Sequence, residues 1–392
     1  MPLNKERAKQ VMRKAGVDAV LATSPANVFY VSDYFSTGMQ LGCGTQGYAF
    51  LPLDAEPALM APLAEADLVA ESGTWIKDIH WWGCLNVNSS KNPEASEITQ
   101  RIIDASQAQA EQTPCDAMVI AVTNRGMAKK TIAVDSDGVS PLRYETIKRN
   151  LPDAKIVDGT RLLEEIRAVK TPEEVELIQK ATEVTEKSME DALEIAQADI
   201  MELDMSQMFS YSVSEDGGRV TQDHIGFGER SAYPNPIPTT HRLAKGDLIK
   251  MNLGSTWGHY HGNVARTAAL GKATPEMEKR LKTVIDAQEA AFDAAKPGAA
   301  FGEVYASIQK ELENGGVKRC NINLGHCIGV ECNERPWIGP GDKRVVEEGM
   351  VLNIDVPYLD LGWGGIQLED TVHVTKKGLR LLTNTERTLY LI

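Results

Sequence analysis

The sequence predicts an α+β protein of two domains, a smaller α/β domain over residues 1–160 and a larger domain over residues 161–392. Helix-like and strand-like stretches alternate along the first part of the chain, which is typical of an α/β domain. A strong helix-start pattern follows near residue 160. Apolar strand patterns and long helical stretches come after it, and 392 residues suffice for two hydrophobic cores.

Short local patterns predict the elements of the first domain. Residues 4–15 are amphipathic with helical spacing. Residues 18–23 form an apolar run that predicts a buried strand, and the turn-forming residues 24–27 follow it. Residues 47–51 and 117–122 have the same apolar character, so we expect them to be further buried strands.

A helix start marks the boundary between the domains. A helical stretch over 162–170 is followed by Thr171-Pro172-Glu173-Glu174. Thr171 suits the N-cap position, and Pro172 suits the first turn, where no backbone N–H is needed. Glu174 completes a capping box with Thr171. A helix beginning here therefore opens the second domain.

The second domain is predicted to contain a hairpin and two long helices. Strands over 248–254 and 258–269 flank the turn Ser255-Thr256-Trp257-Gly258. Helices are expected over 276–295 and 302–314.

Composition and charge exclude several classes of partner. A hydrophobic content of 42% and a charged content of 24% are those of a soluble globular protein. The net charge of −14 argues against nucleic acid and anionic membrane, since both are polyanions. No apolar run approaches the ~20 residues of a membrane helix, and the charged N-terminus lacks the apolar core of a signal peptide. The cysteines include no CxxC pair, so we expect reduced thiols in a cytoplasmic protein. They are Cys43, Cys84, Cys115, Cys320, Cys327 and Cys332.

Five glycine-containing segments of the second domain place polar residues within apolar strand patterns. They are Gly246–Gly254, Gly262–Thr267, Leu324–Gly329, Gly349–Asp355 and Gly365–Asp370. An unpaired carboxylate in such a pattern is costly, which makes a structural accident a poor explanation. The series of segments resembles the creatinase, prolidase and methionine-aminopeptidase family.

This resemblance implies a pita-bread fold, which is a curved antiparallel sheet covered by helices, preceded by a creatinase-type N-terminal domain. Metallopeptidase members of the family hold two divalent metals with Asp, Asp, His, Glu and Glu in that order. Hard dications need anionic oxygen ligands, and this chain offers two carboxylates where those members have four. We therefore expect the fold to be kept and the two-metal centre to be lost, with no metal and no cofactor. The matching positions are Asn252, Asn263, His326, Asp355 and Glu369.

The resemblance also implies roles for these five residues. His326 is expected to transfer protons, while Asp355 and Glu369 orient it or activate water. A satisfied core histidine and a buried hydrogen-bonded network are the alternatives. Asn252 and Asn263 are expected to bind substrate through neutral hydrogen bonds, or else to be a pair of satisfied buried amides.

Four other residues are candidates for substrate binding. His261 shares a strand face with Asn263 if the strand is regular, or else lies at the rim of the sheet. Asn235 and Asn333 stand where family members carry histidines, so hydrogen bonding is kept and proton transfer near neutral pH is removed. Arg335 suits a substrate carboxylate through its planar fork, or alternatively forms a surface salt bridge.

These features together predict a creatinase-like, metal-independent hydrolase of a C–N bond in a small polar metabolite. The resemblance further implies a homodimer. One alternative is a metal-dependent Xaa-Pro dipeptidase or related lyase that tolerates a single ion. A second alternative is a catalytically silent member of the fold that binds a ligand in the same cavity.

Overall fold

The computed structural model describes residues 3–88, 95–318 and 321–392. The chain divides into two compact units, Met1–Arg167 and Ala168–Ile392. Each unit has its own sheet and its own hydrophobic core.

Helix α8 (Thr160–Ala168) is the last element of the first unit. The Arg7 Nε atom donates a hydrogen bond to the Glu165 carbonyl oxygen at 3.3 Å. The buried Arg167 guanidinium donates to the Asn27 side-chain oxygen at 2.7 Å. These bonds tie the helix to the N-terminal elements, and the two compact units divide after Arg167.

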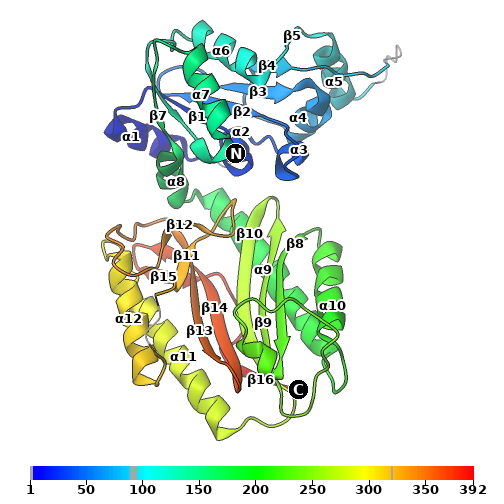
Figure 1. Ribbon diagram of the computed structural model, residues 1–392, viewed down its shortest axis with the longest axis vertical. Coiled ribbons are helices and arrows are strands. Elements are labelled where there is room, and N and C mark those ends of the chain that lie inside the picture. Colours follow the sequence, from blue (N-terminus) through cyan, green and yellow to red (C-terminus); the bar gives the residue numbers. More distant parts are fainter. Residues whose placement is uncertain (1–2, 89–94, 319–320) are drawn as a thin grey trace. The chain divides into compact units, whose positions relative to one another are not determined.

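The first unit is a mixed sheet with helices packed against it (Figure 1). Its strands are β1 (Ala19–Ala22), β2 (Tyr48–Pro52), β3 (Ala58–Pro62), β4 (Ile79–Trp82), β5 (Ala110–Glu111), β6 (Thr131–Val134) and β7 (Lys155–Asp158). Its other helices are α1 (Lys5–Ala15), α2 (Pro25–Ser32), α3 (Thr37–Gln40), α4 (Ala66–Ser72), α5 (Glu97–Gln107), α6 (Pro114–Asn124) and α7 (Pro141–Asn150). The seven strands follow the order β5-β4-β3-β2-β1-β6-β7, with β1, β2 and β3 antiparallel and the remaining pairs parallel. The expected α/β character is confirmed, as are the helix over 4–15 and the strands over 18–23 and 47–51.

Two local predictions in this unit are wrong. Residues 117–122 lie in helix α6, which begins after the N-cap Thr113. A short apolar run does not by itself distinguish a buried helix from a buried strand. Residues 24–27 are not a turn but the start of helix α2, whose N-cap is Ser24.

The second unit is built on a nine-stranded sheet. Its strands are β8 (Arg219–Phe227), β9 (Leu248–Trp257), β10 (Tyr260–Ala269), β11 (Gly325–Cys327), β12 (Glu334–Trp337), β13 (Val351–Asp360), β14 (Gly364–Thr375), β15 (Gly378–Leu381) and β16 (Leu389–Leu391). The main path runs β12-β11-β13-β14-β10-β9-β8, with β15 beside β14 and β16 beside β10. Every pairing is antiparallel except that of β10 with β16. The expected antiparallel sheet is confirmed.

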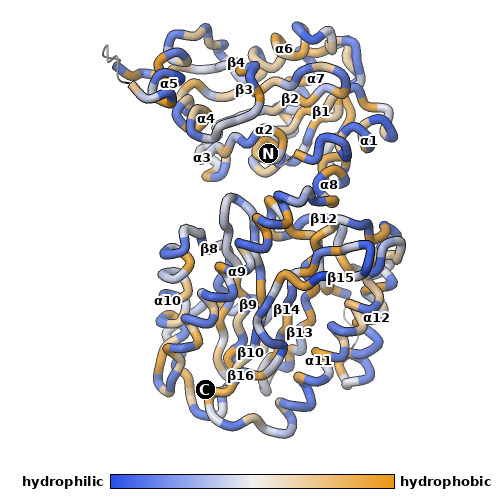
Figure 2. The backbone as a smooth tube through the Cα atoms, turned by 180° about the vertical axis from the view of Figure 1, so that it is seen from behind, coloured by the Kyte–Doolittle hydropathy of each residue, from blue (hydrophilic) through white to orange (hydrophobic). Residues whose placement is uncertain are grey.

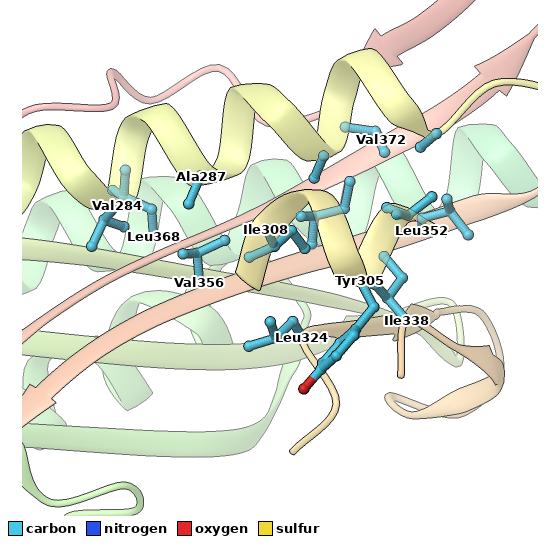
Figure 3. Packing of buried hydrophobic residues seen from close by; sticks show 14 of the residues in the cluster. Val284, Ala287, Tyr305, Ile308, Leu324, Ile338, Leu352, Val356, Leu368 and Val372 are labelled. Atoms are coloured by element: carbon cyan, nitrogen blue, oxygen red, sulfur yellow. The ribbon is translucent and has the colours of Figure 1, made fainter. Parts of the chain in front are cut away.

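Four helices pack on one face of this sheet: α9 (Pro172–Glu194), α10 (Glu202–Glu215), α11 (Pro275–Ala294) and α12 (Phe301–Asn314). Helices α9 and α10 lie against β8, β9 and β10, whereas α11 lies against β13 and β14 with α12 beside it (Figure 1). Figure 3 shows side chains of α11 and α12, such as Val284 and Ile308, packed with Leu352, Val356 and Leu368 of the sheet. Along these helices hydrophilic and hydrophobic residues alternate (Figure 2), as expected when one side of a helix is buried.

The capping box that opens α9 is confirmed. The Glu174 backbone N–H donates to Thr171 Oγ1 at 3.2 Å, and the Thr171 backbone N–H donates to Glu174 Oε2 at 2.8 Å. The predicted hairpin is present, but its turn lies at Gly258 and His259, which have φ values of 56° and 69°. His259 is therefore in the turn and not on the strand face of Asn263.

The cysteines Cys43, Cys84, Cys115, Cys327 and Cys332 are free, and Cys320 lies outside the described residues. Over 3–88, 95–318 and 321–392, no helix combines the length and the apolar character that crossing a membrane requires.

Candidate functional site

Strand alternation separates the second sheet into an apolar face and a polar face. On β9, the side chains of Ile249, Met251 and Leu253 belong to the core under α9 and α10. Successive side chains of a strand point to opposite faces, so Lys250 and Asn252 point away from the helices.

The neighbouring strands continue this pattern in register. Asn252 pairs with Ala265 of β10, Ala265 pairs with Glu369 of β14, and Glu369 pairs with Asp355 of β13. We call the resulting surface the polar face. It comprises Gln222 and His224 (β8), Lys250 and Asn252 (β9), Asn263 and Thr267 (β10), Gln367, Glu369 and Thr371 (β14), Asn353 and Asp355 (β13), and His326 (β11).

The amides of the polar face bind one another. The Asn252 Oδ1 atom accepts hydrogen bonds from Gln222 Nε2 at 2.5 Å and from Asn263 Nδ2 at 3.2 Å. Among the described residues, the buried Asn263 Oδ1 atom has no hydrogen-bond partner. It is an open acceptor, and buried polar groups are ordinarily paired.

The two carboxylates of the polar face lie directly opposite each other on β13 and β14. Gln367 Nε2 donates to Asp355 Oδ1 at 2.8 Å, and Asn353 Nδ2 donates to Glu369 Oε1 at 2.7 Å. Burial, followed by the charge of Asp355, raises the pKa of Glu369 well above its usual range. Burial also raises the pKa of Asp355. Two buried carboxylates that face each other cannot both ionise at low cost, so burial and their mutual repulsion favour the form of the pair that holds a proton.

His326 faces this pair from β11. Its Nδ1 atom lies 2.9 Å from the Cys327 carbonyl oxygen, which only accepts, so the ring proton belongs on Nδ1. Its Nε2 atom then carries the lone pair and lies 3.9 Å from Glu369 Oε1. Burial lowers the pKa of His326, which keeps the ring neutral. Cys327 points into the core on the opposite face, as expected for the next residue of a strand.

Lys250 is a member of the polar face that the sequence analysis missed. Its side chain is completely buried, and its ammonium donates to the carbonyl oxygens of Tyr233 and Pro234. Burial lowers the pKa of Lys250 to about 8, and the charge of Asp355 opposes this shift. Lys250 lies two residues before Asn252 on the same strand, and this spacing indicates that both side chains point to the same face.

The same two-residue spacing precedes both carboxylates. Asn353 lies two residues before Asp355, and Gln367 lies two residues before Glu369. Each strand therefore contributes a carboxylate and an amide to the same face.

The other four predicted residues lie at or beyond the edge of this arrangement. His261 is half-buried on β10, two residues before Asn263, and its backbone N–H donates to the Gly329 carbonyl oxygen at 2.8 Å. Asn235 and Asn333 are exposed, and within the part of the chain that the structure describes neither side chain hydrogen-bonds to the polar face. Arg335 lies over the Trp337 ring, with 4.0 Å between the guanidinium carbon and the ring centroid.

The residues present do not fit a two-metal centre. Within the described residues, no group of three or more His, Cys, Asp or Glu side chains converges on one point. The Asn252 oxygen is already occupied by two amide donors, and only two carboxylates, Asp355 and Glu369, face this part of the sheet. The buried ammonium of Lys250 adds a positive charge to the same face. Two dications would need several anionic ligands to offset their charge.

Comparison with known proteins places both units in known families. The description Metallopeptidase family M24 matches residues 176–376, and Creatinase/Prolidase N-terminal domain matches residues 5–169. An Xaa-Pro dipeptidase of Pyrococcus furiosus is 32% identical over 245 residues, which cover 62% of this chain and 70% of that protein. A putative dipeptidase of Bacillus subtilis is 25% identical over 390 residues, which cover 99% of each chain.

Solved structures share the fold over nearly the whole chain. The prolidase from Pyrococcus furiosus superposes with a TM-score of 0.75 at 25% identity, covering 96% of this chain and 99% of that one. The Xaa-Pro dipeptidase from Bacillus anthracis gives a TM-score of 0.80 at 19% identity, with 99% of both chains covered.

Proposed function

This chain is a hydrolase of C–N bonds that belongs to metallopeptidase family M24, and we propose that it cleaves a small peptide-like amide by proton transfer at the polar face, without a two-metal centre. The predictions of the family and of a hydrolase are confirmed. The relatives' names support the alternative of a metal-dependent Xaa-Pro dipeptidase better than the creatinase-like, metal-independent hydrolase that the sequence predicted.

One observation carries the proposal. The Nε2 atom of His326, which carries the ring's lone pair, lies 3.9 Å from Glu369 Oε1, and Glu369 faces Asp355 in a buried pair whose pKa values are raised by burial. A base and an acid side by side are what hydrolysis of an amide needs, since water must lose a proton and the leaving nitrogen must gain one.

The proposed steps follow from this geometry. His326 Nε2 takes a proton from water, and the resulting hydroxide adds to the amide carbon of the substrate. The carboxyl pair of Asp355 and Glu369 donates its proton to the leaving nitrogen as the C–N bond breaks. The imidazolium of His326 then returns a proton to the pair, which restores the starting state. The open Asn263 oxygen accepts a substrate N–H and orients the bond.

The substrate class is tested with a panel of dipeptides, including Xaa-Pro dipeptides, and with small amides and ureas. Proton NMR would follow release of the free amine. We expect turnover on at least one dipeptide class, and turnover only on non-peptide amides or ureas would contradict the dipeptide assignment. Absence of turnover on the whole panel, combined with saturable binding, would support the silent ligand-binding alternative.

A second candidate is a metal-dependent Xaa-Pro dipeptidase that uses one ion. The similarity to the Pyrococcus furiosus Xaa-Pro dipeptidase favours it. His326, Asp355 and Glu369 are its candidate ligands, but within the described residues no three such side chains converge on a metal position, so this candidate requires them to move closer together. Activity that disappears with a chelator and returns with one equivalent of metal would favour this candidate over the metal-independent one.

A further inference from the structure

Lys250 differs from the other fully buried cations of the second unit. The Lys170 Nζ atom lies 2.5 Å from Glu334 Oε2, and the Arg266 Nη2 atom lies 2.6 Å from Asp370 Oδ1. Lys250 is equally buried, but among the described residues no carboxylate oxygen lies within 4.0 Å of its ammonium. Burying a charge without a direct partner is expensive, so a reason for keeping Lys250 must be sought.

The position of Lys250 supplies that reason. It alternates with Asn252 along β9, so its side chain leaves the strand toward the polar face. The register of β9, β10, β14 and β13 places it on the same face of the sheet as Asp355 and Glu369. Two of its three N–H donors are used by the Tyr233 and Pro234 carbonyl oxygens, which hold the ammonium at this place.

We propose that the Lys250 ammonium is the resident cation of the polar face, which balances the Asp355 and Glu369 carboxylates in place of a metal ion and keeps divalent cations out. The proposal rests on the proposed function for its catalytic meaning, because it concerns the charge balance of the same metal-free polar face. A dication is repelled twice as strongly as a monovalent ion by the same fixed ammonium, which makes divalent metals the sensitive probe.

The test measures manganese and zinc affinity by titration calorimetry in a series of variants. Asn252→Asp with Asn263→Asp restores two carboxylates and gives the background for the series. We expect Lys250→Met in this background to raise the affinity for Mn²⁺ by at least about tenfold, since the repulsion is removed. The matched control is Lys245→Met, because Lys245 is an exposed lysine just before β9 and its removal changes the net charge equally. The control should change the affinity by less than about twofold.

Equal effects of Lys250→Met and Lys245→Met, or no effect of either, would overturn the proposal. If Lys250→Met does not fold, Lys250→Gln takes its place, because the amide keeps N–H donors for the two carbonyl oxygens and lacks the charge. Lys250→Arg keeps the charge and should leave metal affinity low. Metal titration needs no turnover, so failure to find a substrate would count against the proposed function and leave this result standing.

Discussion

The two faces of strands β10 and β14, the helix side and the polar face, surround their buried charged side chains with different partners. On the helix side, Arg266 Nη2 lies 2.6 Å from Asp370 Oδ1, and Thr383 Oγ1 donates to the same carboxylate oxygen at 2.6 Å. On the polar face, one residue away along β14, Glu369 faces Asp355, and its near neighbour is a neutral histidine.

Burial is therefore not what distinguishes the two faces, since Arg266, Asp370 and Glu369 are all at most 1% exposed. The two faces differ in whether a buried carboxylate has an opposite charge in direct contact. On the helix side it has one at hydrogen-bond distance, which favours one fixed structure. On the polar face two carboxylates face each other, which favours sharing and transfer of a proton. Each prediction below probes one side of this contrast.

The largest effect is expected on turnover at the polar face. His326→Ala should lower kcat by a factor of about 10² to 10⁴ with the melting temperature nearly unchanged, because the variant removes the base and little packing. The limb of the pH–rate profile that belongs to the histidine should disappear as well. Near-normal turnover in steady-state assays would remove His326 from the mechanism and direct attention to His261.

On the helix side, the large effect should fall on stability. Arg266→Met leaves the buried Asp370 carboxylate without its cation, and breaking such a pair typically costs about 3–5 kcal/mol. The free energy of unfolding would be measured by urea titration. A loss below about 1 kcal/mol would mean that the two faces do not differ in the way described.

A smaller effect is expected on the pH dependence of stability. Because folding raises the pKa of Glu369, the stabilisation is complete below the unfolded value of about 4.3 and is lost as the pH rises toward the folded value. Glu369→Gln removes this titration while its carbonyl oxygen still accepts from Asn353. Between pH 5 and pH 9, we expect the free energy of unfolding in urea to fall more for the wild type than for the variant. If the free energy of unfolding changed with pH equally in both proteins, a raised pKa of Glu369 in the folded state would be contradicted.

Local features of the fold were predictable from the sequence where the deciding interactions are local. The capping box of Thr171 and Glu174 depends only on residues three apart, and it was found correctly. Residues 117–122 were misassigned because their burial beneath the sheet, and not their periodicity, decides their structure. The hairpin turn was displaced because Trp257, placed in the turn by composition, pairs with Tyr260 in the strands.

The candidate site was predictable only in part. Asn252, Asn263, His326, Asp355 and Glu369 were identified by resemblance, and the structure brings them onto one face. The cross-strand partners could not be predicted, because the register that pairs His224 with Asn252 and brings the Gln222 amide to the Asn252 oxygen is a tertiary property. Lys250 was missed because a lysine in a strand ordinarily extends to solvent, and its burial depends on the loop that supplies Tyr233 and Pro234.

The metal content of active protein tests the central claim most directly. Purified enzyme would be analysed for metals by mass spectrometry, and the same sample would be assayed before and after dialysis against a chelator. We expect far less than one equivalent of transition metal and unchanged turnover, because the polar face has only two carboxylates and a buried lysine. Near-stoichiometric metal, with turnover abolished by the chelator and restored by added manganese, would contradict it.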